Sequence, residues 1–330
     1  MGLDVICVGE MVIDFFPGCE PASYIRNAGG APANVAVAVA RNGHKSGFYG
    51  RMGNDGFGRF LVNTLKENGV TVLCEELADD AVTTMAFVTL DENGERSFTF
   101  ARKPGADMLL KPGDIEREDI ENCTIVHAGS CSLSASPASE ATAYALKLAS
   151  DTGKMVSFDV NYRSLLWNGD EKAAREKIFE VLRYVDLLKI SEEESGMLGG
   201  EGKIGALMKE HGISLVVETL GPRGARSFFR GKTLEASGLK TKTVDATGAG
   251  DAFWGGFLSS LIVQRITNRN QLNEAVVLKA MGYGNIAGAL CVREKGAISS
   301  LPTRGRIEEY LKTEGVYRTG EHLKTGGDPV

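Results

Sequence analysis

The sequence contains little that would bind a metal, form disulfides or cross a membrane. Among 330 residues it has four histidines and six cysteines, and the cysteines are far apart with no CxxC pair. This spacing argues against a structural zinc site and favours buried free thiols in a reducing compartment. No run is as long and apolar as a membrane span, and the start, MGLDVICVGE, lacks the basic region of a signal peptide. We therefore expect a cytoplasmic protein that has no membrane partner.

The charge balance excludes a further class of partner. The formal net charge is −6, and the lysines and arginines are scattered rather than clustered. Such a chain lacks the basic surface that nucleic acid would require. Hydrophobic residues make up 43% and charged residues 24%, as in ordinary globular proteins. A protein of this length can bury a large core, and any site for an anionic substrate must be built locally.

The order of apolar runs predicts an α/β fold. Residues 5–9 form an apolar run closed by glycine, which is typical of a buried strand in a parallel sheet. From residue 124 onward, strand-like and helix-like patterns alternate, which indicates successive βαβ units. We predict strands at 124–128, 156–159, 187–190 and 215–219, and helices at 136–151, 170–184, 203–211, 247–264 and 272–291. The expected architecture is one domain over residues 1–313, with a central mostly parallel sheet flanked by helices, and a polar C-terminal tail over 314–330.

A different pattern predicts a small β lid. VTTMAFVTL and RSFTFAR alternate apolar and polar residues on either side of DENG, as in a hairpin with one wet face. The segment after the first strand is neither helical nor long enough for a domain, so we assign it to further strands of the same sheet. We expect the lid to form from about 11–30 and 82–104. Its apolar face suggests burial against a second subunit, so we predict a homodimer.

The run DATGAGDAFWGGF combines small residues with a carboxylate at the start of an apolar helix. The backbone N–H groups of residues 248–250 would be exposed at the helix N-terminus, which makes an anion site without a side-chain cation. Asp251 beside them would stay ionised and could accept the proton of an alcohol during phosphoryl transfer. The alternative interpretation is a glycine turn with an aspartate helix cap.

A second run, GGAPANVAVAVARNG, begins at Gly29. Its two glycines permit close approach of the backbone to a ligand. Asn34, one turn into the predicted helix, can present both a donor and an acceptor to sugar hydroxyls, and Asp14 can accept from two adjacent hydroxyls. Asn34 could equally be an ordinary polar residue in the first turn of a helix.

Together these runs resemble the signatures of the ribokinase-like sugar kinase family, and the chain is most similar to its fructokinases. GGAPANVAVAVARNGHKSGFYGRMGNDGFG resembles the N-terminal signature and DATGAGDAFWGG the C-terminal one. The resemblance covers about residues 5–303. The lid run GERSFTFARKPGADMLL and the run AGALCVREKGAISSLPT also resemble fructokinases, although Ala101 and Lys103 replace the usual tyrosine and asparagine. The chain lacks a GxxxxGK[ST] loop, as the family does.

The resemblance implies a role for each matching position. Asp251 matches the catalytic base, and Gly248, Ala249 and Gly250 match its anion hole. Contacts to the sugar are implied for Asp14, Gly29, Gly30, Asn34, Arg102, Asn161 and Arg163. The alternating pattern of the hairpin adds Phe100, which could cover the sugar. Binding of ATP is implied for Ser191 (where asparagine is common), Thr219, Gly221, Gly224, Gly248, Gly250 and Asn285. Glu194 matches an acidic residue associated with Mg²⁺, and a monovalent cation such as K⁺ is implied at Asp245, Thr247, Cys291, Glu294, Gly296 and Ser300.

Three hypotheses for the function follow. The first is ATP-dependent phosphorylation of a ketose, D-fructose to fructose 6-phosphate. The second keeps this chemistry with 2-keto-3-deoxygluconate or another sugar, because SFDVNYRSLLW occurs in similar form in both kinases and Arg163 could bind a sugar-acid carboxylate. Plainer alternatives are a structural ion pair for Arg163 and packing of the lid for Phe100. The third is a non-catalytic sugar or nucleotide sensor, which the intact base, anion hole and acidic residue disfavour.

Overall fold

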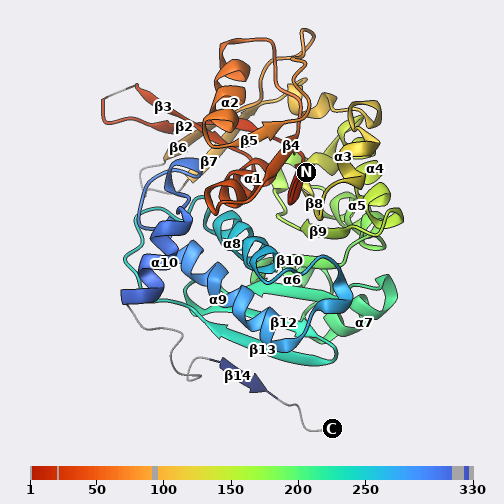
Figure 1. Ribbon diagram of the computed structural model, residues 1–330. Coiled ribbons are helices and arrows are strands. Elements are labelled where there is room, and N and C mark those ends of the chain that lie inside the picture. Colours follow the sequence, from red (N-terminus) through yellow and green to blue (C-terminus); the bar gives the residue numbers. More distant parts are fainter. Residues whose placement is uncertain (1, 21, 91–95, 314–322, 327–330) are drawn as a thin grey trace.

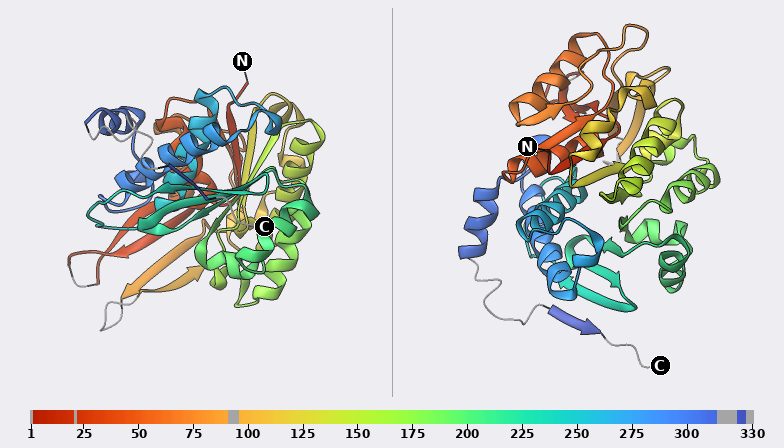
Figure 2. Two further views of the ribbon diagram at one scale, coloured as in Figure 1. Left: turned by 90° about the horizontal axis from the view of Figure 1, so that it is seen from below. Right: turned by 45° about the vertical axis from the view of Figure 1, so that its right-hand side comes forward.

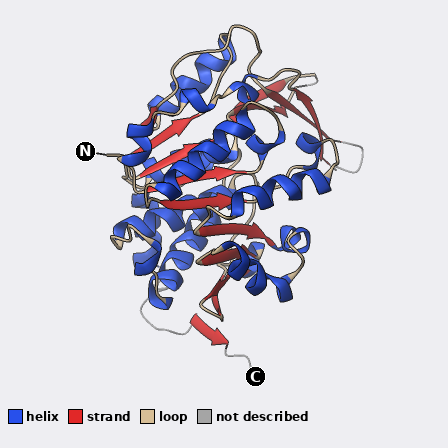
Figure 3. Ribbon diagram, turned by 90° about the vertical axis from the view of Figure 1, so that its right-hand side faces the viewer, coloured by secondary structure: helices blue, strands red, loops and turns tan. Residues whose placement is uncertain are grey.

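The computed structural model describes residues 2–20, 22–90, 96–313 and 323–326. A ten-stranded sheet runs through the middle of the molecule (Figures 1 and 3). In spatial order its strands are β14 (Leu323–Gly326), β13 (Lys232–Ser237), β12 (Gly224–Phe229), β11 (Leu215–Thr219), β10 (Leu187–Ser191), β9 (Met155–Asp159), β8 (Ile125–Gly129), β1 (Val5–Val8), β4 (Ser46–Tyr49) and β5 (Val70–Val72). The strands from β11 to β5 are parallel, and β12 to β14 continue the sheet in antiparallel pairs. The predicted mostly parallel sheet is confirmed.

Helices cover both faces of the parallel strands, which explains why these strands are apolar along their whole length. In β1, Ile6 and Val8 pack into one core, whereas Val5 and Cys7 pack into the other. One face carries α1 (Ala31–Arg41), α2 (Gly56–Glu67), α8 (Ala249–Val263) and α9 (Glu274–Cys291), with α10 (Arg304–Thr313) packed on α9. The opposite face carries α3 (Arg117–Glu121), α4 (Ala138–Asp151), α5 (Glu171–Leu182), α6 (Glu192–Met197) and α7 (Glu201–His211). Within the described ranges, no helix has the length and apolar character of a membrane span.

A separate four-stranded sheet extends from one side of the body (Figure 2, left). Its order is β3 (Tyr24–Gly29), β2 (Val12–Pro17), β6 (Met85–Leu90) and β7 (Arg96–Ala101). The outer pairs are antiparallel, and β2 and β6 run parallel in the middle. The sequence predicted this small sheet. The turn predicted at DENG falls outside the described residues.

One strand lies in a segment for which the sequence predicted none. β14 falls inside the predicted polar tail and pairs with β13 from Thr233 to Ala236. Without it, β13 would present a row of unpaired backbone groups at the edge of the sheet. An extended segment can satisfy such an edge through its backbone alone, so the side-chain pattern gave no sign of this strand.

Candidate active site

A cavity of about 1060 Å³ lies at the carboxyl ends of the central strands and is also lined by the small sheet. Ligands of open parallel sheets bind at this end of the strands, and the volume lies at the upper end of the usual range for small-molecule sites. The predicted residues that line it are Asp14, Gly30, Asn34, Phe100, Arg102, Asn161, Arg163, Ser191, Glu194, Thr219, Gly221, Thr247, Gly248, Gly250 and Asp251. Those outside its lining are Gly29, Gly224, Asp245, Ala249, Asn285, Cys291, Glu294, Gly296 and Ser300.

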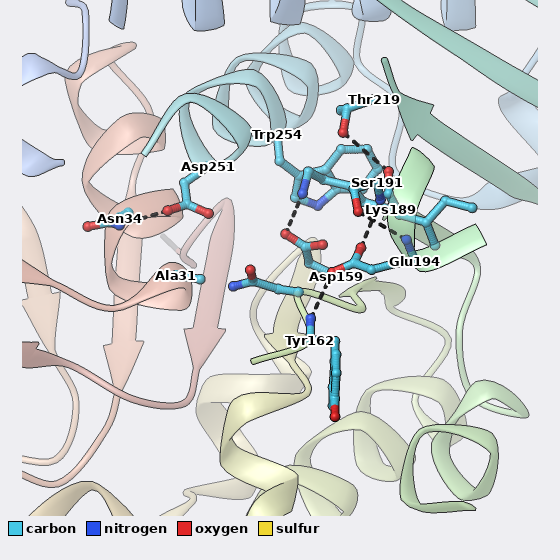
Figure 4. A network of polar contacts seen from close by, with 12 residues as sticks. Ala31, Asn34, Asp159, Tyr162, Lys189, Ser191, Glu194, Thr219, Asp251 and Trp254 are labelled. Atoms are coloured by element: carbon cyan, nitrogen blue, oxygen red, sulfur yellow. Dashed lines mark hydrogen bonds and ion pairs between the residues drawn. The ribbon is translucent and has the colours of Figure 1, made fainter. Parts of the chain in front are cut away.

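Asp251 lies deep in this cavity, in the first turn of α8. Nδ2 of Asn34 donates to Oδ2 of Asp251 over 2.7 Å (Figure 4). Removal from bulk water raises the pKa of Asp251 to about 6, and the hydrogen bond from Asn34 and the charges of Lys189 and Arg163 limit that rise. With this pKa the carboxylate is mostly ionised at neutral pH, and burial is the largest cause of the shift. A neutral amide holds a carboxylate that can accept a proton.

The backbone before Asp251, where the sequence predicts an anion site, forms a tight turn into α8. Gly248 is in the left-handed region at φ 77°, and a Cβ there would lie 3.1 Å from the backbone of Ala297, so the turn requires glycine. The N–H of Ala249 donates to the carbonyl oxygen of Ala246 over 3.2 Å. The N–H groups of Gly250 and Asp251 donate to no backbone acceptor within the described ranges, as expected in a first helical turn. These two groups are available to an anion.

Lys189, a residue not predicted from the sequence, lies beside this anion site. It stands on β10, and its Nζ donates to Oδ2 of Asp159 on β9 over 2.6 Å (Figure 4). A Cβ placed on Gly250 would lie 3.4 Å from the same Nζ. Burial alone would lower the pKa of Lys189, but the carboxylates of Asp159 and Glu194 raise it above its ordinary value. The ammonium is therefore charged and lies beneath the start of α8.

Glu194 links two loops at the side of the cavity that the sequence predicts for the nucleotide. Its Oε2 accepts from the N–H of Ser191 over 2.8 Å, and its Oε1 accepts from the N–H of Tyr162 over 2.7 Å (Figure 4). Oγ of Ser191 in turn accepts from the N–H of Glu194, which completes a capping box at the start of α6. Burial raises the pKa of Glu194, with Asp159 adding to the rise and Lys189 opposing it.

The side of the cavity formed by the small sheet contains Asp14. A Cβ on Gly29 would lie only 2.3 Å from Oδ2 of Asp14, so the absence of a side chain at 29 makes room for this carboxylate. Burial raises the pKa of Asp14 to about 6, and the charge of Arg163 opposes the rise. Gly30 is at φ 114°, and a Cβ there would lie 2.5 Å from the carbonyl oxygen of Glu10. Glycine is required at both positions because neighbouring atoms approach the backbone closely there, and not because the loop is flexible.

Arg102 reaches the cavity from the end of β7 but is already paired. Its Nη2 lies 2.7 Å from Oδ2 of Asp107, and its Nη1 donates to Oγ of Ser134 over 3.0 Å. Asp107 also accepts from Oγ1 of Thr84. Phe100 lines the same wall and is half-buried. Arg102 therefore ties the small sheet to the body. This geometry favours a structural ion pair over a free cation for the substrate.

The turn after β11, predicted to bind the nucleotide, contributes residues 219–223 to the lining of the cavity. Gly221 is at φ 58° and Gly224 at φ 105°, and a Cβ on Gly224 would lie 2.2 Å from the carbonyl oxygen of Ala236. Oγ1 of Thr219 donates to the carbonyl oxygen of Ile190 over 3.3 Å. Asn285, predicted near the adenine, uses its Nδ2 to bind the carbonyl oxygens of Ala236 and Ser237 over 2.9 and 3.1 Å. Its amide nitrogen therefore holds β13, outside the lining of the cavity.

Five of the six residues predicted for a monovalent cation gather behind Gly248. Oδ1 of Asp245 accepts from the N–H of Thr247 over 3.0 Å, and its Oδ2 accepts from the N–H of Gly296 over 3.0 Å. Sγ of Cys291 and Oγ of Ser300 lie 3.0 Å apart, and they donate to the carbonyl oxygens of Thr247 and Gly296 respectively. The sixth residue, Glu294, instead directs its carboxylate to Arg306 at 2.8 Å, where both side chains are largely exposed.

The sequence matches the pfkB family carbohydrate kinase model over residues 3–304. The chain belongs to this family. It is 38% identical to "Probable fructokinase-5" of Arabidopsis thaliana over 323 residues, which is 94% of this carbohydrate kinase and 98% of that protein. The structure of fructokinase from Xylella fastidiosa with bound ATP has a TM-score of 0.87 at 30% identity, covering 94% and 99% of the two chains. Fructokinase from Vibrio cholerae O395 in a fructose-, ADP- and calcium-bound form has a TM-score of 0.82 at 36% identity, with the same coverage, and a double mutant of it was solved with fructose, ADP and potassium.

The predicted family, its ribokinase-like fold and its sugar kinase class are thus confirmed. Lys189 is one of the side chains in the cavity of this carbohydrate kinase that the sequence did not predict. It left a signal in the sequence, because a charged residue inside an apolar strand run such as DLLKIS is costly unless it is paired or functional. That signal identifies the residue as unusual but does not say what it faces.

Proposed function

We propose that this carbohydrate kinase transfers the γ-phosphoryl group of ATP to D-fructose and forms fructose 6-phosphate. The observation that carries the proposal is the position of Asp251, which lies at the N-terminus of α8 and is held by Asn34 over 2.7 Å. The carboxylate lines the same cavity as residues assigned to the sugar, such as Asp14, and residues assigned to the nucleotide, such as Thr219. The similarity to fructokinases supports a ketose as the acceptor.

The proposed reaction needs one base and one anion site. Asp251 accepts the proton of the hydroxyl on C6 of fructose while that oxygen forms a bond to the γ-phosphorus. The bond from the γ-phosphorus to the β–γ bridging oxygen breaks, and its electron pair leaves with ADP. The N–H groups of Gly250 and Asp251 would stabilise the charge on the oxygens of the moving phosphoryl group. The small sheet would cover the sugar and exclude water, which limits hydrolysis of ATP.

We assign Mg²⁺ to the phosphates of ATP rather than to a cage of protein side chains. In the parts of the chain that the structure describes, no group of three or more His, Cys, Asp or Glu side chains could hold a metal ion. Mg²⁺ typically keeps several waters and binds substrate phosphates, whose charge it neutralises. Both oxygens of Glu194 already accept backbone N–H groups, so this residue fits a water-mediated contact. Ser191, Thr219, Gly221 and Gly224 would hold the nucleotide.

The cluster around Asp245 fits a monovalent cation, and we propose K⁺ there. The carbonyl oxygen of Thr247 accepts from the thiol of Cys291, and that of Gly296 accepts from the hydroxyl of Ser300. The carboxylate of Asp245 lies next to them. Hard cations are held by such oxygens. An ion bound here would fix the turn before α8 and therefore the direction of the N–H groups at the anion site.

We further propose a homodimer that forms through the small sheet. Tyr24 and Ile25 on β3 are 46% and 55% exposed, and Val82 near β6 is 52% exposed. Burial of such an apolar face against a second copy would remove it from water. All six cysteines are free, which supports a reducing compartment, the cytoplasm.

The test is a coupled ADP-release assay on a panel of ketoses, aldoses and 2-keto-3-deoxygluconate, with the wild type and Asp251→Asn. We expect the highest kcat/KM for D-fructose. Loss of a general base typically costs about 10²–10⁴-fold in rate, so Asp251→Asn should lose activity by at least that factor while calorimetry still detects fructose binding. A preference for 2-keto-3-deoxygluconate would favour the alternative in which Arg163 binds the carboxylate. No turnover with any sugar would contradict the kinase proposal in favour of a sensor.

A further inference from the structure

The polar wall of the cavity contains more acidic than free basic side chains. Asp14, Asp251, Glu10 and Glu194 all line it. A site for a polyphosphate must offset both these carboxylates and the charge of the nucleotide. Arg102, Arg163 and Lys189 also line this wall. Arg102 uses its Nη2 and Nη1 for Asp107 and Ser134, whereas Lys189 has a single partner within the described ranges, Asp159.

Lys189 is placed by the register of the sheet. It stands directly opposite Asp159 in the parallel pair of β10 and β9. Ser157, two residues before Asp159, points to the same face of the sheet, and its Oγ accepts from Nε1 of Trp254 on α8 over 2.8 Å. The face that holds Lys189 and Asp159 is therefore the face that α8 covers. The 3.4 Å separation between Nζ and a Cβ placed on Gly250 locates the ammonium under the first turn of that helix (Figure 4).

The two partners of this ion pair differ in what they face. Lys189 lines the cavity, whereas Asp159 is not part of its lining. Their side chains are 7% and 1% exposed. An ammonium has three N–H donors, and within the described ranges Nζ of Lys189 has one hydrogen bond, the one to Asp159. Asp159 thus binds the ammonium from the side away from the cavity. The remaining N–H donors of Lys189 are on the cavity side.

Stability does not account for this pair. Taking an ammonium and a carboxylate out of water costs several kcal/mol per ion, and replacing a buried pair by apolar residues is often neutral or stabilising. Moreover, Oδ1 of Asp159 has no hydrogen-bond partner in the described part of the chain, so the pair is not a fully satisfied structural network. Binding of a ligand in the cavity therefore explains the presence of this buried pair better than stability does.

We propose that Lys189 is a catalytic residue that contacts the oxygens of the transferred phosphoryl group, with Asp159 as its positioning residue. This assignment rests on the proposed function. As the sugar oxygen bonds to the γ-phosphorus and the electron pair of the breaking bond leaves with ADP, Lys189 stays protonated and the proton of the sugar goes to Asp251. The ammonium would offset charge on oxygens that the N–H of Gly250 also contacts.

Asp159 has a second consequence for the base. Lys189 is close enough to Asp251 to lower the pKa of that carboxyl, yet the hydrogen bond of its ammonium goes to Asp159. Without Asp159, the ammonium could turn and pair with Asp251. A carboxylate paired with a lysine is a weaker base. Asp159 would therefore keep the cation for the phosphoryl group and the base for the sugar.

The test compares single variants with a double variant. Removal of one electrostatic donor from such a site typically lowers kcat by about 10²–10³-fold, and we expect this from Lys189→Met, with KM for fructose changed less than about threefold. Lys189→Arg should retain intermediate activity. Lys189→Met leaves Asp159 as an unpaired buried charge, so the decisive variant is Asp159→Asn/Lys189→Met, which removes both charges. A structural pair predicts that the double variant regains wild-type kcat, whereas a catalytic lysine predicts that it stays low.

A matched control is the ion pair between Glu218 and Arg226, which joins β11 and β12 in register and lies outside the cavity lining. Glu218→Gln/Arg226→Met should keep kcat near the wild-type value. A second readout does not depend on turnover: calorimetry of ADP with Mg²⁺ and aluminium fluoride, a mimic of the moving phosphoryl group. Lys189→Met should weaken this binding at least about tenfold more than binding of ADP alone.

The outcomes separate the two proposals. If the wild type phosphorylates no sugar, the proposed function fails, and the aluminium fluoride measurement still tests Lys189. Recovery of kcat in the double variant, or equal loss of affinity for ADP with and without aluminium fluoride, would overturn the assignment of Lys189.

Discussion

The hydrogen bond from Asn34 to Asp251 makes a quantitative prediction about pH. The pKa of Asp251 is raised to about 6 by its removal from bulk water, and the amide of Asn34 is the largest influence that opposes the rise. Asn34→Ala removes the donor, which lies 2.7 Å from Oδ2. The carboxylate should then be harder to ionise, and the pKa should rise further. Because a general base must be ionised to accept a proton, the acid limb of the rate profile should move to higher pH.

The size of the shift follows from the strength of the lost bond. A hydrogen bond to a charged group contributes about 1.5–3 kcal/mol, and one pKa unit corresponds to about 1.4 kcal/mol. The midpoint of the acid limb should therefore move from about 6 to about 7–8. At pH 7 the ionised fraction of the base would fall from about nine-tenths to between about one-half and one-tenth. A water that enters the space left by the amide would reduce the shift without reversing its direction.

The assay is kcat/KM for fructose between pH 5 and 9.5, which reports the free enzyme. Loss of contacts between Asn34 and the sugar would lower kcat/KM at every pH. It would not move the midpoint of the acid limb, which is the quantity compared. Asn42→Ala is the control, since Asn42 is a buried asparagine at the C-cap of the same helix and lies outside the cavity lining. Its Nδ2 donates to the carbonyl oxygen of Ala38, and its Oδ1 accepts from the hydroxyl of Tyr283. This variant should leave the limb near pH 6. A limb that stays in place or moves to lower pH in Asn34→Ala would refute the role of this hydrogen bond.

Two further substitutions test other parts of the site. In Gly29→Ala the new methyl group would lie 2.3 Å from Oδ2 of Asp14 and would displace this carboxylate. A displacement of about 1 Å can cost about 10²-fold, so KM for fructose should rise about 10–100-fold. Gly56→Ala is the control, because its methyl group meets nothing within 4 Å and should leave KM unchanged. Burial raises the pKa of Glu10 from 4.5 to about 7, so its folded form holds a proton more tightly than its unfolded form, and stability is lost as pH rises through this range. Glu10→Gln should therefore stabilise the protein at pH 8 relative to pH 5 by up to about 3 kcal/mol in denaturant unfolding, and the exposed Glu235→Gln should not; an equal gain at both pH values would contradict this account.

Much of the strand and helix order could be predicted because most of the buried parallel strands are short, largely apolar runs that alternate with helical patterns. The grouping of Asp251 with Asn34 could be expected only through the resemblance, since the two residues are 217 positions apart. Family position did not fix side-chain direction. Glu294 and Asn285 occupy matching positions, yet the carboxylate of one lies with Arg306 at the surface and the amide of the other holds β13.

The pair of Lys189 and Asp159 shows what the sequence alone could not supply. The two residues are 30 positions apart, and either could have faced either side of the sheet. Their contact depends on the register of β9 and β10, because a shift of one residue would place Lys189 on the opposite face, among the apolar side chains of the second core. Register is set by packing over the whole sheet, which no local run of residues encodes.

The partner of each charge in this site favours Asp251 in its proposed role as the base. Had Lys189 paired with Asp251, the ion pair would have depressed the pKa of the carboxyl and weakened it as a proton acceptor. The structure instead pairs Lys189 with Asp159 and gives Asp251 a neutral amide. The pKa of Asp251 then stays near 6, low enough for ionisation at neutral pH and high enough to accept a proton from an alcohol that is losing it in the transition state. The same arrangement leaves the ammonium of Lys189 on β10 beside the proposed anion site, so this choice of partners would provide both a base in the first turn of α8 and a cation beneath it.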